Sequence, residues 1–493
     1  MKKYLKVQSD RKNYHVNPFK NTVHRSSLLA PVMPKAQTWV TFVNHFLLKR
    51  NYKSVALKIV AIGGEGEFID SNTLEIYEPK VYSYNLSKLF YNNKKIKNYL
   101  IEFYSDKNLF IPFPAVIVSH RGKDFCNIVH SFNRVLNDVF ENDEINQEVV
   151  AESSFEVKVN RKFDTFFNVA TGMNSVKGNL KISYEKNKTQ INKNLKVFIP
   201  RLGYKSFYLS KIMPKIPEGG TIKINQPKPE LFFGRMFVGR INKKTKAFSA
   251  NHSFYDMSKT KEYFNSDISY RTYPYFENYS NKIILYPIFS PCKLDIYLEV
   301  KNKDKTFRSK KFKFESNSSI PLEIDVSEFI SSIKAKNINA FTVLAKSKKN
   351  KIPTRVNHQL VYGGLSKNGS LSCSINVSLT NDKIFVPKNK KSFVWGAAFN
   401  NKNYHSHIGF CFRKAEGKKE KISIDFYGDK GKIKTEKAII EPSRSHIINL
   451  KKLFKNNKSN YLWYVAKSPR GDLNAYSIHR NYSSDHFSGE HNF

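Results

Sequence analysis

Short stretches in which apolar and polar residues alternate recur along this chain and predict β-strands. Period-two alternation is the mark of a strand with one buried face. Four stretches have this pattern: KSVALKIVAI (53–62), KGNLKISYEK (177–186), CKLDIYLEV (292–300) and EKISIDFYG (420–428). Each follows a more continuously apolar opening strand: TWVTFVNHFLL, FDTFFNVATG, NKIILYPIFS and SFVWGAAFNN. Helical periodicity is weak, and its best candidate, residues 133–143, is expected to be a connector between domains.

A second pattern shows that these stretches belong to repeated units. The segment EPKVYSYNLSKLF (78–90) returns as EPSRSHIINLKKLF (441–454), and looser copies lie at 199–213 and 318–330. The shared apolar anchors are Leu86, Leu209, Val326 and Leu450, which are 123, 117 and 124 residues apart. We interpret the element as a turn whose apolar residues close the end of a β-sandwich.

A histidine follows each anchor and gives the repeat a second marker. These residues are His130, His252, His358 and His479, at separations of 122, 106 and 121. A period of about 120 residues is too long for a solenoid repeat or a propeller blade, and it suits independently folding domains. Each unit is expected to hold three strands, the turn, a further strand and a closing strand that carries the histidine.

The predicted fold is all-β, with four tandem β-sandwich domains of roughly 120 residues. The expected boundaries are a lead segment at 1–35, units at 36–145, 150–260, 265–365 and 370–482, and a tail at 483–493. The tyrosine-rich stretch SYRTYPYFENYSN (269–281) is expected to lie in a connector before the third unit, where its rings could stack on sugars or bases.

The charge of the chain has two interpretations. The formal net charge is +42, which favours a polyanionic partner such as nucleic acid, an acidic glycan or anionic lipid. Only 16 of the 83 basic residues are arginine, the residue preferred for bidentate reading of phosphates and bases. The lysines are also spread along the chain together with Asn, Ile, Phe and Tyr, as compositional drift would produce. Both interpretations stay open.

The sequence bears on the cellular location of the protein and on cofactors only through features that it lacks. The four cysteines, Cys126, Cys292, Cys373 and Cys411, are dispersed, which suits a reducing compartment. The first residues have no apolar signal region, and no apolar run is long enough to span a membrane. We therefore expect a cytoplasmic protein without a cofactor, and nothing in the sequence indicates an oligomeric state.

Several quoted segments together resemble the sensory rhodopsin transducer family of bacteria. The matching pieces are IIEPSRSHIINLKKL and FIPRLGYKSFYLSKI, with the strand ends SANHSFYD and CNIVHSFN. The third unit departs from the pattern, because it lacks the Pro-basic start and has Gln359 in place of serine. The resemblance implies a β-sandwich that assembles as a tetramer, couples to a membrane photoreceptor, and acts in binding and signalling rather than catalysis.

The repeated histidines are the sharpest candidates for a site. A His–Ser pair suggests a nucleophile and its base, but neighbouring residues on a strand face opposite sides of the sheet. His130, His252, His358 and His479 are therefore candidate partner-binding residues, with a structural role as the alternative. The sequence HSH at 405–407 places two imidazoles on one strand face without an evident third ligand, so no metal site is predicted.

The resulting hypothesis is a non-enzymatic binding or scaffold protein that recognises a protein or carbohydrate. One alternative is an enzyme acting on a glycan or cell-envelope precursor, with histidine and acidic residues between two sandwiches. A weaker alternative is nucleic-acid binding driven by lysine. No catalytic residues are predicted.

Overall fold

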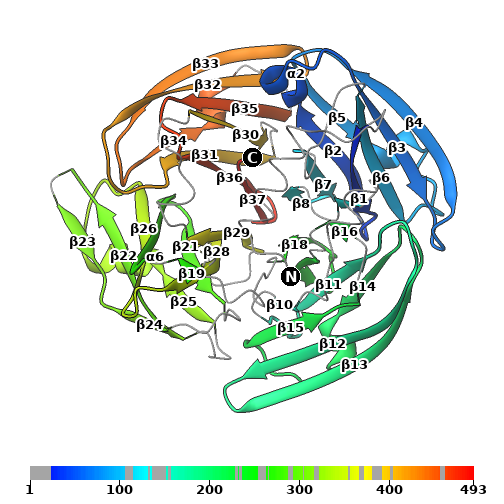
Figure 1. The fold of residues 1–493 in the computed structure, drawn as a ribbon, viewed down its shortest axis with the longest axis horizontal. Coiled ribbons are helices and arrows are strands. Elements are labelled where there is room, and N and C mark those ends of the chain that lie inside the picture. The colour runs from blue at the N-terminus through cyan, green and yellow to red at the C-terminus, as the bar shows by residue number, and fades with distance from the viewer. Residues whose placement is uncertain are drawn as a thin grey trace. The chain divides into compact units, whose positions relative to one another are not determined.

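A computed structural model describes most of the chain, and the arrangement of its strands is drawn in Figure 1. The described residues are 24–105, 115–130, 134–135, 151–153, 157–227, 231–232, 236–253, 263–264, 266–286, 293–303, 305–315, 321–353, 356–365, 371–379, 391–399, 403–455 and 461–493.

The chain builds four domains, and each has eight strand positions distributed over two antiparallel sheets. Domain 1 contains β1 (His24–Pro31), β2 (Gln37–Val43), β3 (Val55–Ile62), β4 (Phe68–Ile76), β5 (Val81–Asn85), β6 (Asn98–Ser105), β7 (Ile117–Arg121) and β8 (Cys126–His130). Domain 2 contains β10 (Ala151–Ser153), β11 (Phe163–Ala170), β12 (Val176–Lys186), β13 (Thr189–Ile199), β14 (Tyr204–Tyr208), β15 (Thr221–Asn225), β17 (Phe237–Asn242) and β18 (Phe248–His252).

The second half of the chain repeats this plan. Domain 3 contains β20 (Ile268–Pro274), β21 (Ser280–Leu285), β22 (Lys293–Lys301), β23 (Thr306–Arg308), β24 (Phe312–Glu315), β25 (Leu322–Asp325), β26 (Ala340–Ser347), β28 (Val356–Gly363) and β29 (Cys373–Leu379), with β23 and β24 sharing the fourth position. Domain 4 contains β30 (Ser392–Phe399), β31 (Tyr404–Phe412), β32 (Glu420–Gly428), β33 (Gly431–Ile440), β34 (Ser445–Asn449), β35 (Tyr461–Ser468), β36 (Leu473–Asn481) and β37 (Phe487–His491).

The order of strands within the sheets is the same in all four domains. The first sheet has the order first, sixth, third, fourth, and the second sheet has the order fifth, second, seventh, eighth. In domain 1 two short strands, β9 (Arg134–Val135) and β16 (Leu231–Phe232), extend the first sheet beyond β1. A separate ladder pairs β19 (Tyr263–Phe264) with β27 (Ile352–Pro353). The prediction of an all-β chain with four tandem β-sandwich domains is confirmed.

Each domain packs its two sheets face to face around one core. In domain 4 the core joins Ile422 and Ile424 of the first sheet to Ile408 and Phe410 of the second, all 0–3% exposed. Alternate residues of each strand therefore point inward, as the period-two pattern predicted.

The repeated turn lies between the fifth and sixth strands as a short helix. These helices are α3 (Leu86–Leu89), α5 (Leu209–Ile212), α6 (Val326–Ser332) and α8 (Leu450–Leu453). The anchors Leu86, Leu209, Val326 and Leu450 are at most 1% exposed, and the residues four positions later are also buried. The anchors thus plug one end of each sandwich, as the sequence suggested. The additional helix α2 (His45–Arg50) follows β2.

In three of the four domains the side chain of the residue before the anchor caps the helix. Asn85, Asp325 and Asn449 each accept a hydrogen bond from a backbone N–H three residues later, at 2.9–3.2 Å. Domain 2 has Tyr208 at this position. There the side chain of Asp164, from the neighbouring strand β11, accepts the hydrogen bond from the N–H of Ser210 at 3.1 Å.

Removing one cap should have a modest and local cost. We expect Asn85→Ala to lower the free energy of unfolding by about 1 kcal/mol, because one backbone N–H loses its acceptor. Urea unfolding followed by the fluorescence of Trp39 measures the change. The amide of Asn85 also donates to the side chain of Gln37 at 3.0 Å, so Gln37→Ala, which removes only that bond, is the matched control. An equal loss in Asn85→Ala and Gln37→Ala would contradict the capping role.

The domains group into two compact units. The first comprises Met1–Lys123 and Val129–Thr260, and the second comprises Asp124–Ile128 and Lys261–Phe493. In the first unit, Leu29 and Leu100 from the first sheet of domain 1 pack with Ala170 and Leu202 of domain 2. The side chain of Asn98 also donates a hydrogen bond to the carbonyl of Leu202 at 3.0 Å.

In the second unit, domains 3 and 4 contact each other through the same pair of sheets. The N–H of Thr272, in the first sheet of domain 3, donates to the carbonyl of Arg413, which follows β31 in the second sheet of domain 4, at 3.1 Å. Cys411 and Tyr476 of domain 4 join the apolar core of domain 3. In both units, therefore, the first sheet of the earlier domain packs on the second sheet of the later one.

The structure moves several of the predicted boundaries. Strand β1 falls in the predicted lead segment, β29 belongs to domain 3 rather than to the fourth unit, and β37 falls in the predicted tail. The tyrosine-rich stretch at 269–281 is not a connector, because most of it forms β20 and the start of β21. Each domain has eight strand positions rather than five, since short strands leave little alternation to detect.

Three further expectations can be compared with the described residues. Cys126, Cys373 and Cys411 are buried and form no disulfide with a described residue, whereas Cys292 lies outside the described residues. The predicted connector at 133–143 also lies outside them, apart from residues 134 and 135 in β9. Among the described helices, none has the length and apolar character needed to cross a membrane.

Candidate functional site

The outer face of the first sheet of domain 4 carries lysines alternating with apolar residues. One row crosses all four strands in register, with Phe393 on β30 opposite Lys467 on β35, Lys467 opposite Ser423 on β32, and Ser423 opposite Lys437 on β33. At about 4.8 Å between strands, this row is about 14 Å long. We call these four residues the cationic row.

A second row, two residues along each strand, completes the surface. Lys421 pairs directly with Ile439, and Lys391 and Pro469 line the same cavity, whose volume is about 1000 Å³. Because side chains two apart on a strand share a face, cationic and apolar side chains alternate along and across the sheet. Ile439 is 58% exposed, although it extends an apolar stretch that could have been buried.

The lysines of the cavity are available to a ligand. None of Lys391, Lys421, Lys437 and Lys467 forms an ion pair with a carboxylate of the described chain. The ammonium of Lys467 lies 5.4 Å from the centre of the Phe393 ring, a cation–π contact that holds both side chains on the face. By contrast, Lys432 and Lys434 on β33 pair with Asp425 and Glu436 at 2.7 and 2.8 Å.

The corresponding row of domain 3 differs at two positions, and one of the two differences introduces a charge. Ile268, Lys346, Asp295 and Lys313 are paired in the same order across its first sheet. The neighbouring residues on the same strands, which point into the core, show that the two rows correspond. Ile296 pairs with Ala345 in domain 3 as Ile424 pairs with Ala466 in domain 4, and all four side chains are fully buried. Where domain 4 has Ser423, domain 3 thus has a carboxylate, which pairs with Lys311 at 3.7 Å.

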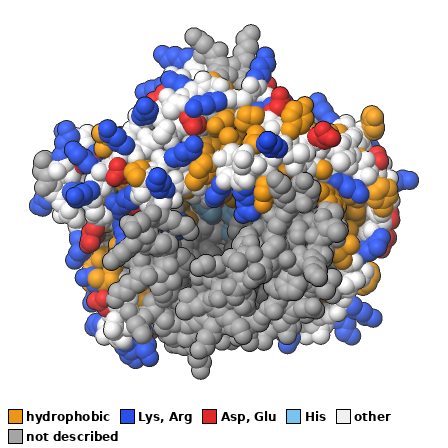
Figure 2. Space-filling view, turned by 45° about the horizontal axis from the view of Figure 1, so that its top comes forward, with side chains coloured by type: hydrophobic (Ala, Val, Ile, Leu, Met, Phe, Trp, Pro, Cys, Tyr) orange, Lys and Arg blue, Asp and Glu red, His pale blue; other side chains and the backbone are white. Residues whose placement is uncertain are grey.

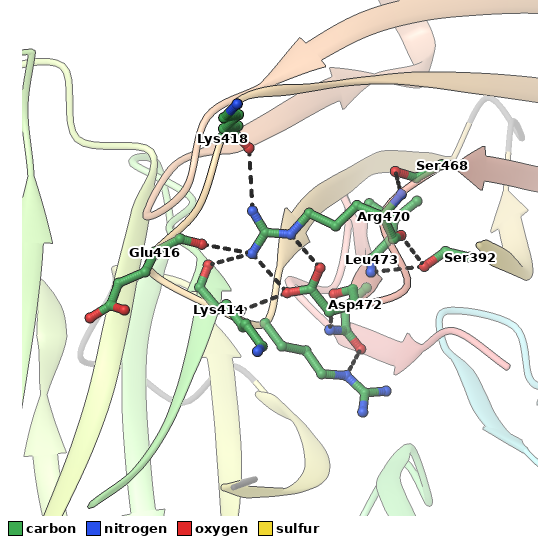
Figure 3. Close-up of polar contacts among 10 residues, drawn as sticks. Ser392, Lys414, Glu416, Lys418, Ser468, Arg470, Asp472 and Leu473 are labelled. Atoms are coloured by element: carbon green, nitrogen blue, oxygen red, sulfur yellow. Dashed lines mark hydrogen bonds and ion pairs between the residues drawn. The ribbon is translucent and has the colours of Figure 1, made fainter. Parts of the chain in front are cut away.

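The end of the cavity is shaped by the loop that joins β35 to β36. Arg470 holds this loop by an ion pair with Asp472, at 2.5 Å from its Nε and 3.0 Å from its Nη2 (Figure 3). The guanidinium also donates to the carbonyls of Lys414, Glu416 and Lys418 and lies 4.4 Å from the centre of the Phe412 ring.

Two serines connect this ion pair to the cavity. The hydroxyl of Ser392 donates to the carbonyl of Arg470 at 2.7 Å and accepts from the N–H of Leu473 (Figure 3). The hydroxyl of Ser468 accepts from the N–H of Arg470 at 3.1 Å. Both serines line the cavity, so the buried ion pair fixes the shape of its rim.

The described lining of the cavity offers positive charge and apolar surface. Its described lining contains lysine, serine, proline and apolar side chains, with no carboxylate, imidazole or thiol that could act as a general base or nucleophile. The lysines can neutralise negative groups while Phe393, Ile439 and Pro469 contact apolar faces. This arrangement suits an anionic ligand that also has apolar ring faces.

The four histidines predicted from the sequence do not occupy one repeated position. His130 and His252 are the last residues of the eighth strands of domains 1 and 2, and their rings meet edge to face at 4.6 Å. His358 and His479 lie on the seventh strands of domains 3 and 4. The histidines that served as the second repeat marker therefore lie on two different strands of the domain. In domains 3 and 4 the eighth strand follows the histidine, so the predicted boundaries left β29 and β37 outside their domains.

All four histidines are at most 5% exposed. The hydroxyl of Tyr273 lies 2.7 Å from Nε2 of His358, and Nδ1 of His479 lies 2.8 Å from the hydroxyl of Ser406. Burial lowers the pKa of both His358 and His479 to about 3, so both are neutral. Their burial favours the structural role, and the role of these four residues in binding a partner stays a prediction.

The histidines of the HSH motif face a single amide. Nε2 of His405 and Nε2 of His407 lie 3.0 and 3.2 Å from the side-chain nitrogen of Asn449. Burial, followed by the charge of His405, lowers the pKa of His407 to about 4. Both rings thus accept hydrogen bonds from Asn449, the residue that caps α8, and the motif serves the turn between the fifth and sixth strands.

The sequence did not reveal the lysine cavity because lysines are spread along the whole chain, and those of the cavity do not stand out among them. Over the described surface seen in Figure 2, lysine and arginine side chains are indeed spread among uncharged ones. A usable signal was the pattern of β33, where Lys437 and Ile439 point outward on the same face. An outward isoleucine beside outward lysines departs from the usual polar exterior of a strand.

Comparisons with known proteins place the chain in no family. No family model matches it, and no curated protein does so. One similar solved structure is a tetra-tandem repeat in the extending region of a large adhesion protein, with 8% identity, 95% of this chain and 98% of that chain covered, and a TM-score of 0.12. Another is the M60 catalytic domain with the CBM51-1 and CBM51-2 domains of ZmpB from Clostridium perfringens, with 9% identity, 92% and 55% covered, and a TM-score of 0.13.

Proposed function

We propose that this protein is a non-enzymatic binding protein whose domain 4 takes up an acidic polysaccharide across the outer face of its first sheet. The observation that carries the proposal is the alternation of lysines that lack carboxylate partners with exposed apolar side chains along the cationic row and beside it. A chain of uronate or sulfated sugars offers the matching surface, because its rings present apolar faces and its edges carry negative charge.

Other anionic partners suit this surface less well. Single-stranded nucleic acid is bound by successive aromatic platforms, whereas the described lining of the cavity has one aromatic side chain, Phe393. Extended peptides usually pair with a sheet edge, whereas the cationic row crosses the face of the sheet. Lysine rather than arginine also suits sulfate or carboxylate groups at varied positions, because an ammonium is a point charge without a fixed fork. A binding role agrees with what the resemblance to the transducer family implies.

The decisive variant exchanges one residue of domain 4 for its counterpart in domain 3. We expect Ser423→Asp to weaken binding of polygalacturonate about 10-fold, or about 1.4 kcal/mol, because a carboxylate then sits between Lys467 and Lys437. The fold should tolerate the change, since Asp295 occupies the matching position. Ser423→Asn, which has the same shape without the charge, is the matched control.

Binding is measured by calorimetry at low salt, with neutral dextran, polyglutamate and oligothymidylate as comparison ligands. A second control, Lys193→Gln with Lys196→Gln, removes two exposed charges from β13, the strand of domain 2 that corresponds to β33. Equal weakening by this pair and by Ser423→Asp would reduce the effect to net charge and refute the site. Tighter binding of polyglutamate or oligothymidylate would overturn the ligand class.

A further inference from the structure

A cluster of buried charge in the second unit requires a partner that its own side chains do not supply. Arg271, on β20 of domain 3, is 9% exposed and donates to the carbonyl of Ser378 at 3.1 Å. Its other terminal nitrogen donates to the side-chain oxygen of Asn474, on β36 of domain 4, at 2.9 Å. The guanidinium therefore lies between the two domains of this unit.

A second arginine shares the same acceptor. Nε of Arg413 donates to the side-chain oxygen of Asn474 at 3.1 Å, so the two donor nitrogens are no more than 6.0 Å apart. Burial, followed by the charge of Arg271, lowers the pKa of Arg413 to about 10. Two guanidinium groups that repel each other are thus held together by one neutral amide.

The nearest carboxylate is already engaged. Asp472 is 1% exposed, receives two hydrogen bonds from Arg470, and accepts a third from the N–H of Lys414 at 3.0 Å. The remaining titratable neighbours, Tyr273, Tyr476, Cys411 and His358, are neutral, because burial raises the pKa of the first three and lowers that of the histidine. Three guanidinium groups and one carboxylate leave two uncompensated positive charges.

One polar group in the cluster is left without an acceptor. Nε of Arg271 and the hydroxyl of Tyr476 are buried, and neither has a well-formed hydrogen bond with a described residue. The two side chains lie within hydrogen-bonding reach of each other, so the guanidinium can donate to the phenol oxygen while the phenol O–H still needs an acceptor. A buried hydroxyl that needs an acceptor beside uncompensated positive charge is an environment that a small anion satisfies.

We propose that a small monovalent anion, chloride under ordinary conditions, binds between domains 3 and 4, held by Arg271, Arg413 and Tyr476. The anion supplies negative charge beside the two guanidinium groups and accepts a hydrogen bond from the hydroxyl of Tyr476. Arg413 is only partly buried, which leaves a route for the ion to enter. The ion thereby stabilises the packing of domain 4 on domain 3 and acts independently of the polysaccharide face.

The experiment compares thermal unfolding of the full chain in sodium chloride and in sodium gluconate at equal ionic strength. Chloride should raise the Tm by roughly 2–4 °C, and Arg271→Gln should abolish that difference. Arg444→Gln is the matched control, because Arg444 also reaches across the two domains, to the carbonyls of Lys301 and Asn337. The control and Ser423→Asp should both retain the chloride effect.

A second measurement keeps the test decisive if Arg271→Gln does not fold. Crystals of the parent protein soaked in bromide should show an anomalous peak within hydrogen-bonding distance of Arg271 and Tyr476. Equal Tm values in chloride and gluconate, a water in place of the bromide, or a chloride effect that survives Arg271→Gln would each overturn the proposal. Failure of polysaccharide binding alone would leave it standing.

Discussion

Lowering the pH from 7 to 5 is expected to destabilise both units of the protein by several kcal/mol. The cause is a set of buried histidines whose lowered pKa keeps them neutral in the fold, two of them in each unit. Burial lowers the pKa of His45 to about 3 and of His120 to about 4 in the first unit, and of His358 and His479 to about 3 in the second.

The direction follows from where the protons bind. In the unfolded chain each imidazole takes up a proton below about pH 6.5, whereas in the fold it stays neutral down to pH 3 or 4. Stability is therefore complete above pH 6.5 and falls as the pH drops through the window between 6.5 and 4. At pH 5 each buried histidine costs on the order of 2 kcal/mol, so a pair removes about 4 kcal/mol from a typical 5–15 kcal/mol.

Urea midpoints at pH 7, 6 and 5 measure this effect, with Trp39 reporting on the first unit and Trp395 and Trp463 on the second. His358→Gln should make the unfolding of the second unit less dependent on pH, whether or not it lowers stability at pH 7. His446→Gln is the control, because this partly exposed side chain contributes less. Identical midpoints at pH 7 and pH 5 would show that the buried imidazoles do not govern acid stability.

Replacing Asp472 by asparagine should cost domain 4 about 3–5 kcal/mol. The side chain of Asp472 is 0% exposed and that of Arg470 is 16% exposed, so the substitution leaves a positive charge in a poorly solvated place without its counter-charge. The same change should loosen the loop that carries Ser468 and Pro469, and weaker binding of polygalacturonate should accompany the loss of stability.

Chemical unfolding followed at Trp395 and Trp463 gives the size of the effect. The matched control is Glu299→Gln, which breaks an ion pair with Arg308 at the surface and should cost less than about 1 kcal/mol. Joint replacement of Arg470 and Asp472 by leucine should recover part of the loss, because no unpaired charge remains. A cost for Asp472→Asn equal to that of Glu299→Gln would contradict the role of the buried pair.

The architecture could be predicted from the sequence because its main signals are local. The third strand of each domain buries one face, so its apolar and polar residues alternate along the sequence. The turn that follows is marked by one buried apolar residue in each domain: Leu86, Leu209, Val326 and Leu450. The histidine marker failed because it relied on residue type alone. His252 ends an eighth strand and His358 belongs to a seventh, a difference that depends on pairing with strands distant in sequence.

The candidate site escaped prediction for a related reason. Phe393, Ser423, Lys437 and Lys467 come from four strands and meet only through the register of the sheet. Read along the chain, each lysine is one of many. The contrast between Ser423 and Asp295, which separates the surface of domain 4 from that of domain 3, becomes visible only once both registers are known.

The shared strand order also constrains how each domain can fold during synthesis. The third and fourth strands form a hairpin, with eleven register pairs in β12 and β13, and can pair as soon as both have emerged. The first strand must wait for the sixth, which in domain 1 joins residues 24–31 to residues 98–105. We therefore expect every domain to assemble outward from its central hairpin, with its earliest strand left unpaired until most of that domain has left the ribosome.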